Sequence, residues 1–283
     1  METFLPVVSD GPAVDVEVTS AQAIEMRLTS NDLRRRMGLD FDPLLIDEEA
    51  GELRVVGIAG AMKAGPLALE IQPTFMEHDP RWRAEFLRCV AQVEELDWRP
   101  EVKPGRERRS LPDLLGMVVD HGLLRALTEG VPRRSHEAVV TSSNVRGQLD
   151  ISQVWKRAID PGAIACRVSQ LDQDNEVLSS LKWVAAELAE SAHLPWLREE
   201  LTRFSEHWPE VSAELPPPAI VETMQVPPQF GYLGDAIEVV RLVSRAPFVG
   251  IGRAGGRALV WRTSDLLLRY DRDLKVSKRA VIS

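Results

Sequence analysis

The chain has 283 residues, of which 44% are hydrophobic and 27% charged, a length that suggests two domains and a composition typical of folded globular proteins. Its apolar runs are far shorter than the roughly 20 residues that a membrane-spanning helix needs. The N-terminus also lacks the basic and apolar regions of a secretory signal. We therefore expect a cytoplasmic protein that does not enter a membrane.

Charge is distributed unevenly along the chain. The formal net charge is −9, with −7 over residues 1–60 and +7 over residues 241–283. A basic segment of this kind can contact a polyanion or an acidic partner surface. A solvated basic tail would give the same pattern, so the charge alone leaves both interpretations open.

The first 75 residues are rich in predicted strands. Apolar and β-branched residues over 14–18, 52–58 and 67–73 are separated by Gly and Pro, which is typical of short strands joined by turns. Ser30 has the character of a helix N-cap and Gly38 that of a helix stop, which predicts a short helix ending near Met37. We assign residues 1–78 to a small β-rich N-terminal module.

Residues 79–246 show mainly helical periodicity. Trp183, Trp196 and Trp208 fall on or beside the predicted helices at positions that suit the core better than base stacking. The predicted amphipathic helices cover residues 81–96, 110–122, 175–192, 195–208 and 233–243.

The helical period is lost between residues 131 and 169. β-branched pieces alternate there with Arg, Ser and Gly, which favours an extended hairpin. The predicted fold class is therefore α+β, with a small β-rich N-terminal module and then a helical domain that carries an inserted extended β-hairpin finger. Residues 247–283 form a basic C-terminal segment, in which 258–270 begins with strand character.

The sequence contains no clear cofactor or metal site. Cys89 and Cys166 lie far apart, and the five histidines lack ligand spacing, so a zinc site is not expected. The glycines of residues 250–256 contain the string G-x-G-x-x-G, but it lies after a helix and before a strand. A dinucleotide site needs the opposite order, which makes this segment a turn-forming loop.

Catalytic motifs are also missing from the sequence. No P-loop string occurs, so we do not expect the chain to be an NTPase. A metal-dependent nuclease needs an acid followed by [DE]-x-Lys. Two strings fit loosely, 273–275 after Asp265 and 101–103 after Asp97, and solvated surface charges explain both. We therefore predict no catalytic residues and no enzyme activity.

Residues 144–151 and 172–178 form the most informative stretch. Gly147 relieves a turn between extended pieces, and Arg146 is a fixed cation beside it. Asp172, Asp174 and Asn175 are typical caps of the helix that follows. By itself this pattern predicts a hairpin joined to a well-capped helix, with no enzymatic content.

These motifs resemble the middle of McrC proteins, in which an Arg-Gly turn is followed by a D-x-x-N step into a helix. Residues 52–74 are similar to a strand pair that ends in I-x-P-K in that family, although Thr74 stands here in place of Lys. Residues 111–130 and 227–246 match helices of the family in position. The resemblance covers most of residues 50–270 and rests on the order and spacing of short motifs.

The resemblance implies a role as the subunit that docks on a McrB-like AAA+ motor in a restriction or anti-phage system. In that family a projecting finger enters the central pore of the hexamer and stimulates nucleotide hydrolysis, and residues 131–169 correspond to it. The family's nuclease residues have no matching positions in this sequence. We therefore expect a non-catalytic adaptor, with cleavage left to a separate nuclease or other effector.

The finger stretch is basic, with a net charge of +3 over residues 131–169, which suits an acidic pore or a phosphate backbone. The predicted partner-binding residues are Arg133, Arg134, Asn144, Arg146, Gly147, Lys156 and Arg157.

An alternative hypothesis is a DNA-binding module that needs no motor. Its phosphate contacts would come from the basic C-terminal segment, and its affinity would fall steeply with salt. The candidate residues for these contacts are Arg253, Arg257, Arg262, Lys275, Lys278 and Arg279.

Overall fold

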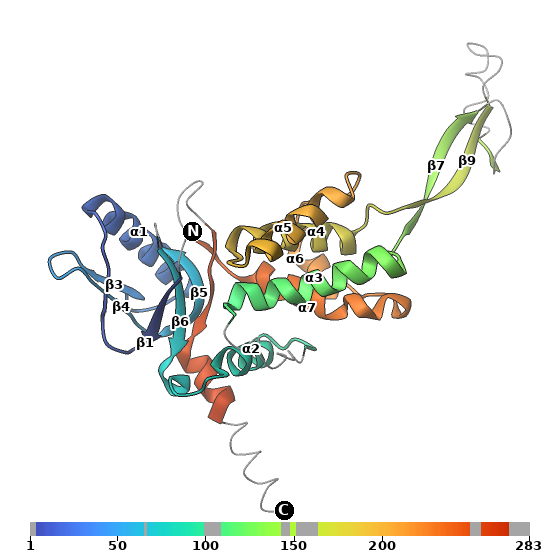
Figure 1. Ribbon diagram of the computed structural model, residues 1–283. Helices are drawn as coiled ribbons and strands as arrows, with labels where there is room; N and C mark the ends of the chain where they lie inside the picture. Colours follow the sequence, from blue (N-terminus) through green and yellow to red (C-terminus); the bar gives the residue numbers. More distant parts are fainter. Residues whose placement is uncertain are drawn as a thin grey trace, which may run out of the picture.

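Two small sheets form the N-terminal module in the computed structural model, which describes residues 4–64, 67–98, 109–142, 148–150, 164–249 and 256–271 (Figure 1). The larger sheet has the order β1-β6-β5-β12, in which β1 is parallel to β6 and the other pairs are antiparallel. The smaller sheet has the order β2-β4-β3 and is antiparallel. The strands are β1 (Phe4–Ser9), β2 (Val14–Asp15), β3 (Leu44–Asp47), β4 (Glu52–Val55), β5 (Ile58–Ala64), β6 (Leu67–Pro73) and β12 (Leu259–Arg262).

Helix α1 (Ser20–Met37) is longer than the sequence predicts, because its N-cap is Thr19 and not Ser30. Thr19 and Gln22 form a capping box, in which the Thr19 hydroxyl accepts from the Gln22 N–H and the Gln22 side chain accepts from the Thr19 N–H. The predicted C-terminal stop is confirmed, since Gly38 adopts a left-handed φ of 60°. Ser30 lies inside the helix, where its hydroxyl bonds to the backbone of Leu44.

Helices make up the rest of the body, which confirms the predicted α+β fold class. Helices α3, α4, α5 and α7 pack against one another around buried leucines such as Leu123 and Leu178. No described helix is both long and apolar enough to cross a membrane. The helices are α2 (Trp82–Val93), α3 (Leu111–Glu129), α4 (Glu176–Ser191), α5 (Pro195–His207), α6 (Pro218–Thr223) and α7 (Gly234–Arg245), with short 3₁₀ turns at Thr74–Met76 and Pro228–Leu233.

The prediction that all three tryptophans of this region lie in the core is wrong for one of them. Trp183 and Trp208 are buried, but Trp196 is 47% exposed. Trp196 follows Pro195 in the first turn of α5, whose buried side is formed by Leu197, Leu201 and Phe204. The spacing of these three residues turns Trp196 towards solvent.

A buried ion pair joins the larger sheet to the helices. Glu70 of β6 is only 5% exposed and accepts from Arg83 of α2 at 2.5 and 3.0 Å. The same carboxylate accepts from the backbone N–H of Leu111, the first residue of α3, at 2.9 Å. One side chain therefore fixes the start of α3 and the side of α2 to the sheet.

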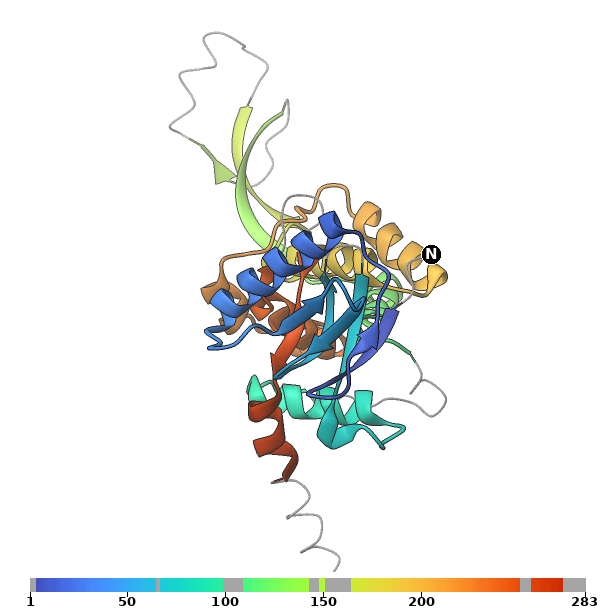
Figure 2. The same cartoon turned by 90° about the vertical axis from the view of Figure 1, so that its left-hand side faces the viewer.

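The end of the described chain returns to the N-terminal module. Strand β12 pairs with β5, and residues 263–271 form a helix beyond it (Figures 1 and 2). A short hairpin of β10 (Phe248–Val249) and β11 (Gly256–Arg257) precedes β12. The sequence does not indicate this return, which adds a strand from the predicted C-terminal segment to the first sheet.

The contact between β5 and β12 depends on a glycine. Gly60 has a φ of 136°, and a Cβ atom there would lie 2.0 Å from the Leu259 carbonyl oxygen. Backbone atoms cannot yield as a flexible side chain can, so an added methyl group forces the strands apart.

We expect Gly60→Ala to destabilise the protein by about 3 kcal/mol or more, because it combines a backbone clash with an unfavourable φ. Urea unfolding would measure the change. Gly234→Ala is the matched control, since nothing lies within 4 Å of the added Cβ and the residue is helical. The control should shift the free energy of unfolding by less than about 1 kcal/mol. Equal effects of the two changes would contradict the role of Gly60.

Candidate functional site

A long antiparallel hairpin projects from the helical body (Figures 1 and 2). Its two main strands are β7 (Arg134–Ser142) and β9 (Ile164–Asp172), which pair along their full length. Strand β8 (Gln148–Leu149) pairs with the other edge of β9, so β9 is the central strand. The predicted extended finger is therefore confirmed, and we call residues 131–172 the finger.

Three contacts fix the base of the finger to the body. The Tyr232 hydroxyl donates to the carbonyl of Gly130, where α3 ends. The Asn175 side-chain amide donates to the Pro132 carbonyl at 3.0 Å. Arg134 forms an ion pair with Glu176 of α4 at 3.1 Å. The chain is thus held on entry to β7 by two parts of the body, the start of α4 and the turn before α7.

The phenol group of Tyr232 stays protonated at neutral pH. Burial, with a smaller contribution from Glu129, raises the pKa of the Tyr232 phenol, so the hydroxyl remains a donor. The Arg125 guanidinium lies 4.7 Å from the centre of the Tyr232 ring and adds a cation–π contact.

The three predicted cap residues lie together at the step from β9 into α4. Asn175 is the N-cap, since its side-chain oxygen accepts from the N–H groups of Val177 and Leu178 at 3.1 and 3.2 Å. Asp172 accepts from the Asp174 N–H at 2.9 Å and shapes the turn. Asp174 accepts from the Ser212 N–H at 3.3 Å, which ties the turn to the chain after α5.

The described surface of the finger carries exposed cations. Arg133, Arg134 and Arg167 are exposed, and Glu137 is an exposed acid on the same strands. Arg167 lies 3.6 Å from the carboxylate of Asp150, which is only 4% exposed. This pairing leaves Arg133 as the exposed cation of the finger base for which no ion pair is seen in the part of the chain that the structure describes.

Several of the predicted contact residues lie outside the part of the chain that the structure describes. Those of the finger that lie outside the described residues are Asn144, Arg146, Gly147, Lys156 and Arg157. Those of the C-terminal segment that lie outside them are Arg253, Lys275, Lys278 and Arg279.

Arg257 and Arg262 of the C-terminal segment hold parts of the protein together. Arg262 donates to the carbonyls of Met37 and Gly38 at the C-terminus of α1. Arg257 donates to the Ala246 carbonyl at 2.8 Å and lies near Glu187 and over the Trp183 ring. Burial raises the pKa of the Glu187 carboxyl, and the charge of Arg257 opposes that rise. These contacts favour a structural role for both arginines over phosphate binding.

Sequence reasoning missed an apolar surface beside the finger. Leu124 and Leu127, on the last two turns of α3, are 46% and 41% exposed, and Val139 of β7 is 53% exposed. The predicted helix ends at residue 122, before these leucines, whereas α3 continues to Glu129. Only the packing of the body shows that they face solvent close to the finger base.

The described residues contain no group of three or more His, Cys, Asp or Glu that could hold a metal ion. Both cysteines are free thiols in buried positions.

The fold is similar to that of chains in solved McrBC assemblies. In the cryo-EM structure of the Thermococcus gammatolerans McrBC complex, the match has a TM-score of 0.69 and 15% identity and covers 97% of this chain and 87% of that chain. In a half-complex from a tetradecameric assembly of T. gammatolerans McrB AAA+ hexamers with bound McrC, the TM-score is 0.67 at 14% identity, covering 95% of this chain and 69% of that chain. At such identities the likeness establishes a shared, McrC-like fold.

Comparisons with protein-family models and with curated proteins gave no match.

We expect Asn175→Ala to destabilise the protein by about 2 kcal/mol, from the loss of a helix cap and of a hydrogen bond to the finger. Asn175→Asp keeps the acceptor for the α4 N–H groups and removes the donor to Pro132. Asn175→Asp should lower the free energy of unfolding by about half as much as Asn175→Ala, and it should still raise the rate of amide hydrogen exchange in β7. Urea unfolding and exchange would measure the two effects, and unchanged exchange in both variants would contradict the anchoring role.

Proposed function

We propose that this protein is a non-catalytic McrC-like adaptor, whose finger enters the central pore of a McrB-like AAA+ hexamer and stimulates its nucleotide hydrolysis. Such a subunit would serve a bacterial restriction or anti-phage system. The observation that carries the proposal is a long, anchored, cationic finger on a fold shared with McrBC assemblies.

The dimensions of the finger suit insertion into a ring. Strand β7 has nine residues, which corresponds to about 30 Å of extended chain. Its pairing with β9 satisfies backbone groups along the whole strand, so the finger can leave the body without unpaired polar groups between the two strands. An antiparallel hairpin is also narrow enough to be surrounded by other subunits.

The base of the finger is suited to transmit a force or a displacement to the helical body. Gly130 is bound by Tyr232 in the turn before α7, and Pro132 and Arg134 are bound by Asn175 and Glu176 at the start of α4. Because the three anchored residues lie within five positions of the chain, the finger cannot rotate at its base without breaking more than one of these contacts. A partner that holds the finger therefore also holds the helical body.

The surface at the finger base suits a protein partner. Leu124 and Leu127 offer apolar area on the last turns of α3, and Arg133 offers a charge four residues after that helix ends. Apolar residues surrounded by polar ones are typical of protein interaction sites. Nucleotide hydrolysis would take place on the motor, and DNA cleavage would belong to a separate nuclease or other effector.

The alternative, a DNA-binding module without a motor, has less support. It relies on the basic C-terminal segment, where Arg257 and Arg262 already bond within the chain. The net charge of −7 over residues 1–60 would also repel phosphate groups.

Replacing residues 136–170 by the dipeptide Asn-Gly should abolish most of the stimulation of the AAA+ partner while leaving the fold intact. Ser135 and Leu171 are register partners, so a two-residue turn can close the shortened hairpin without moving its base. The measurement is the nucleotide hydrolysis rate of the AAA+ protein encoded beside this gene, alone and with the purified full-length or shortened chain. Full stimulation by the shortened chain would refute the role of the finger.

Arg133→Ala should weaken binding to the motor by up to about fivefold, since an exposed ion pair contributes about 0.2–1 kcal/mol. Arg81→Ala is the matched control, because Arg81 is an equally exposed cation at the start of α2 and outside the finger. Binding titrations at two salt concentrations would show whether the difference shrinks with salt, as charge contacts require. Steep salt-dependent binding of duplex DNA by the chain alone would instead support the alternative.

A further inference from the structure

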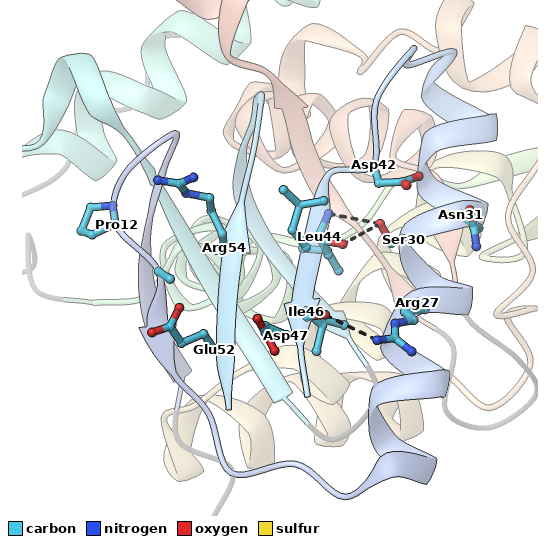
Figure 3. Close-up of a pocket in the computed structure, with 12 residues that line it drawn as sticks. Pro12, Arg27, Ser30, Asn31, Asp42, Leu44, Ile46, Asp47, Glu52 and Arg54 are labelled. Atoms are coloured by element: carbon cyan, nitrogen blue, oxygen red, sulfur yellow. Dashed lines mark hydrogen bonds between the residues drawn. The ribbon is translucent and has the colours of Figure 1, made fainter. Parts of the chain in front are cut away.

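The smaller sheet of the N-terminal module has one open face. Leu44, Leu53 and Val55 of β3 and β4 pack into the core, while Leu45, Asp47, Glu52 and Arg54 alternate with them on the other side. An open groove of about 840 Å³ lies over this second face, between α1 and the loop before β2 (Figure 3). We call this groove the acidic groove.

Helix α1 closes one edge of the sheet beside the acidic groove. The Ser30 hydroxyl bonds to the N–H and carbonyl of Leu44 at 3.1 and 3.3 Å, and Arg27 donates to the Ile46 carbonyl at 3.5 Å (Figure 3). These groups of β3 are the ones that an added strand would need. A ligand must therefore lie over the face of the sheet and not extend it at this edge.

A row of like charges crosses the same sheet. Glu52 of β4 is the register partner of Asp15 on β2 and of Asp47 on β3. Carboxylates directly opposite one another destabilise a sheet. Within the described residues no ion pair involves any of the three, whereas the nearby Asp42 and Glu48 pair with Arg34 and Arg27 at 2.9 and 2.6 Å. The sheet therefore carries a charge pattern that works against its own stability.

The chemistry of the acidic groove selects the class of ligand. Its carboxylates repel nucleic acid. Of the two arginines that line the groove, Arg27 is neutralised by Glu48, whereas Arg54 donates to the Gly11 carbonyl at 3.1 Å and keeps its charge. Leu45, which is 46% exposed, lies two residues from Asp47 on the same face of β3 and offers an apolar contact. The complementary ligand is a polypeptide in which cationic side chains stand near an apolar one.

We infer that the acidic groove is a docking site for a Lys/Arg-rich segment of a second protein, with Asp47 and Glu52 binding the cations and Leu45 the apolar residue. This surface lies in the N-terminal module, whereas the finger leaves the far side of the helical body (Figure 1). The inference goes beyond the proposed function, because it rests on other residues and does not require a motor.

The test is selection of phage-displayed random 12-residue peptides on the full chain, followed by measurement of their affinity by fluorescence anisotropy. We expect the selected peptides to be rich in Lys and Arg and to lose about tenfold in affinity for D47N/E52Q, since two exposed ion pairs are removed. Both substitutions keep the shape of the side chain. Asp47 Oδ1 accepts from the N–H groups of Glu49 and Ala50, and the amide oxygen that D47N introduces can accept from the same two groups, so the turn is preserved.

The matched control is E199Q/E206Q, which removes two exposed carboxylates from α5 and should leave peptide affinity unchanged. Thermal unfolding gives a second readout, because removing the row of like charges should raise the melting temperature of D47N/E52Q and not that of the control. Selected peptides that are not basic, equal binding to D47N/E52Q, or failure to select any peptide would each overturn the inference. Stimulation of an AAA+ partner should be unaffected by D47N/E52Q, so the two proposals fail separately.

Discussion

The antiparallel pairing of β12 with β5 is the constraint on which the rest of the structure depends. The chain leaves the larger sheet after β6, builds the helical body and the finger, and then returns to pair residues 259–262 with residues 58–61. Both ends of the helical body are therefore attached to one sheet. Gly60 makes the close approach possible, and Arg262 ties the returning strand to the end of α1. The orientation of the finger relative to the N-terminal module follows from this closure.

The finger combines local and distant interactions. Its strands pair with each other through backbone hydrogen bonds, which any suitable β-forming sequence could supply. Its base depends on side chains from α4 and from the turn before α7, namely Asn175, Glu176 and Tyr232. A hairpin of this length would be only marginally stable alone, so the helical body decides how the finger is presented.

The two proposed binding surfaces differ in charge and in place. The finger and its base present Arg133 beside exposed leucines, while the acidic groove presents Asp47 and Glu52 beside Leu45. Opposite charges select different partners, and they disfavour binding of either partner at the other partner's surface. A chain of this design could hold a motor at one end and a second protein at the other, which is the arrangement that an adaptor needs.

The sequence by itself determined the α+β class, the hairpin between residues 131 and 169, and the Asn175 cap, because period, β-branched composition and capping are local properties. It placed the start of α1 wrongly, since Ser30 has the residue type of a cap but Thr19 and Gln22 complete the capping box. Only the tertiary structure brought β12 to β5, placed Glu52 between two acids and exposed Trp196 and Leu124. These features join residues far apart in the chain, and no local pattern records which distant segments will meet.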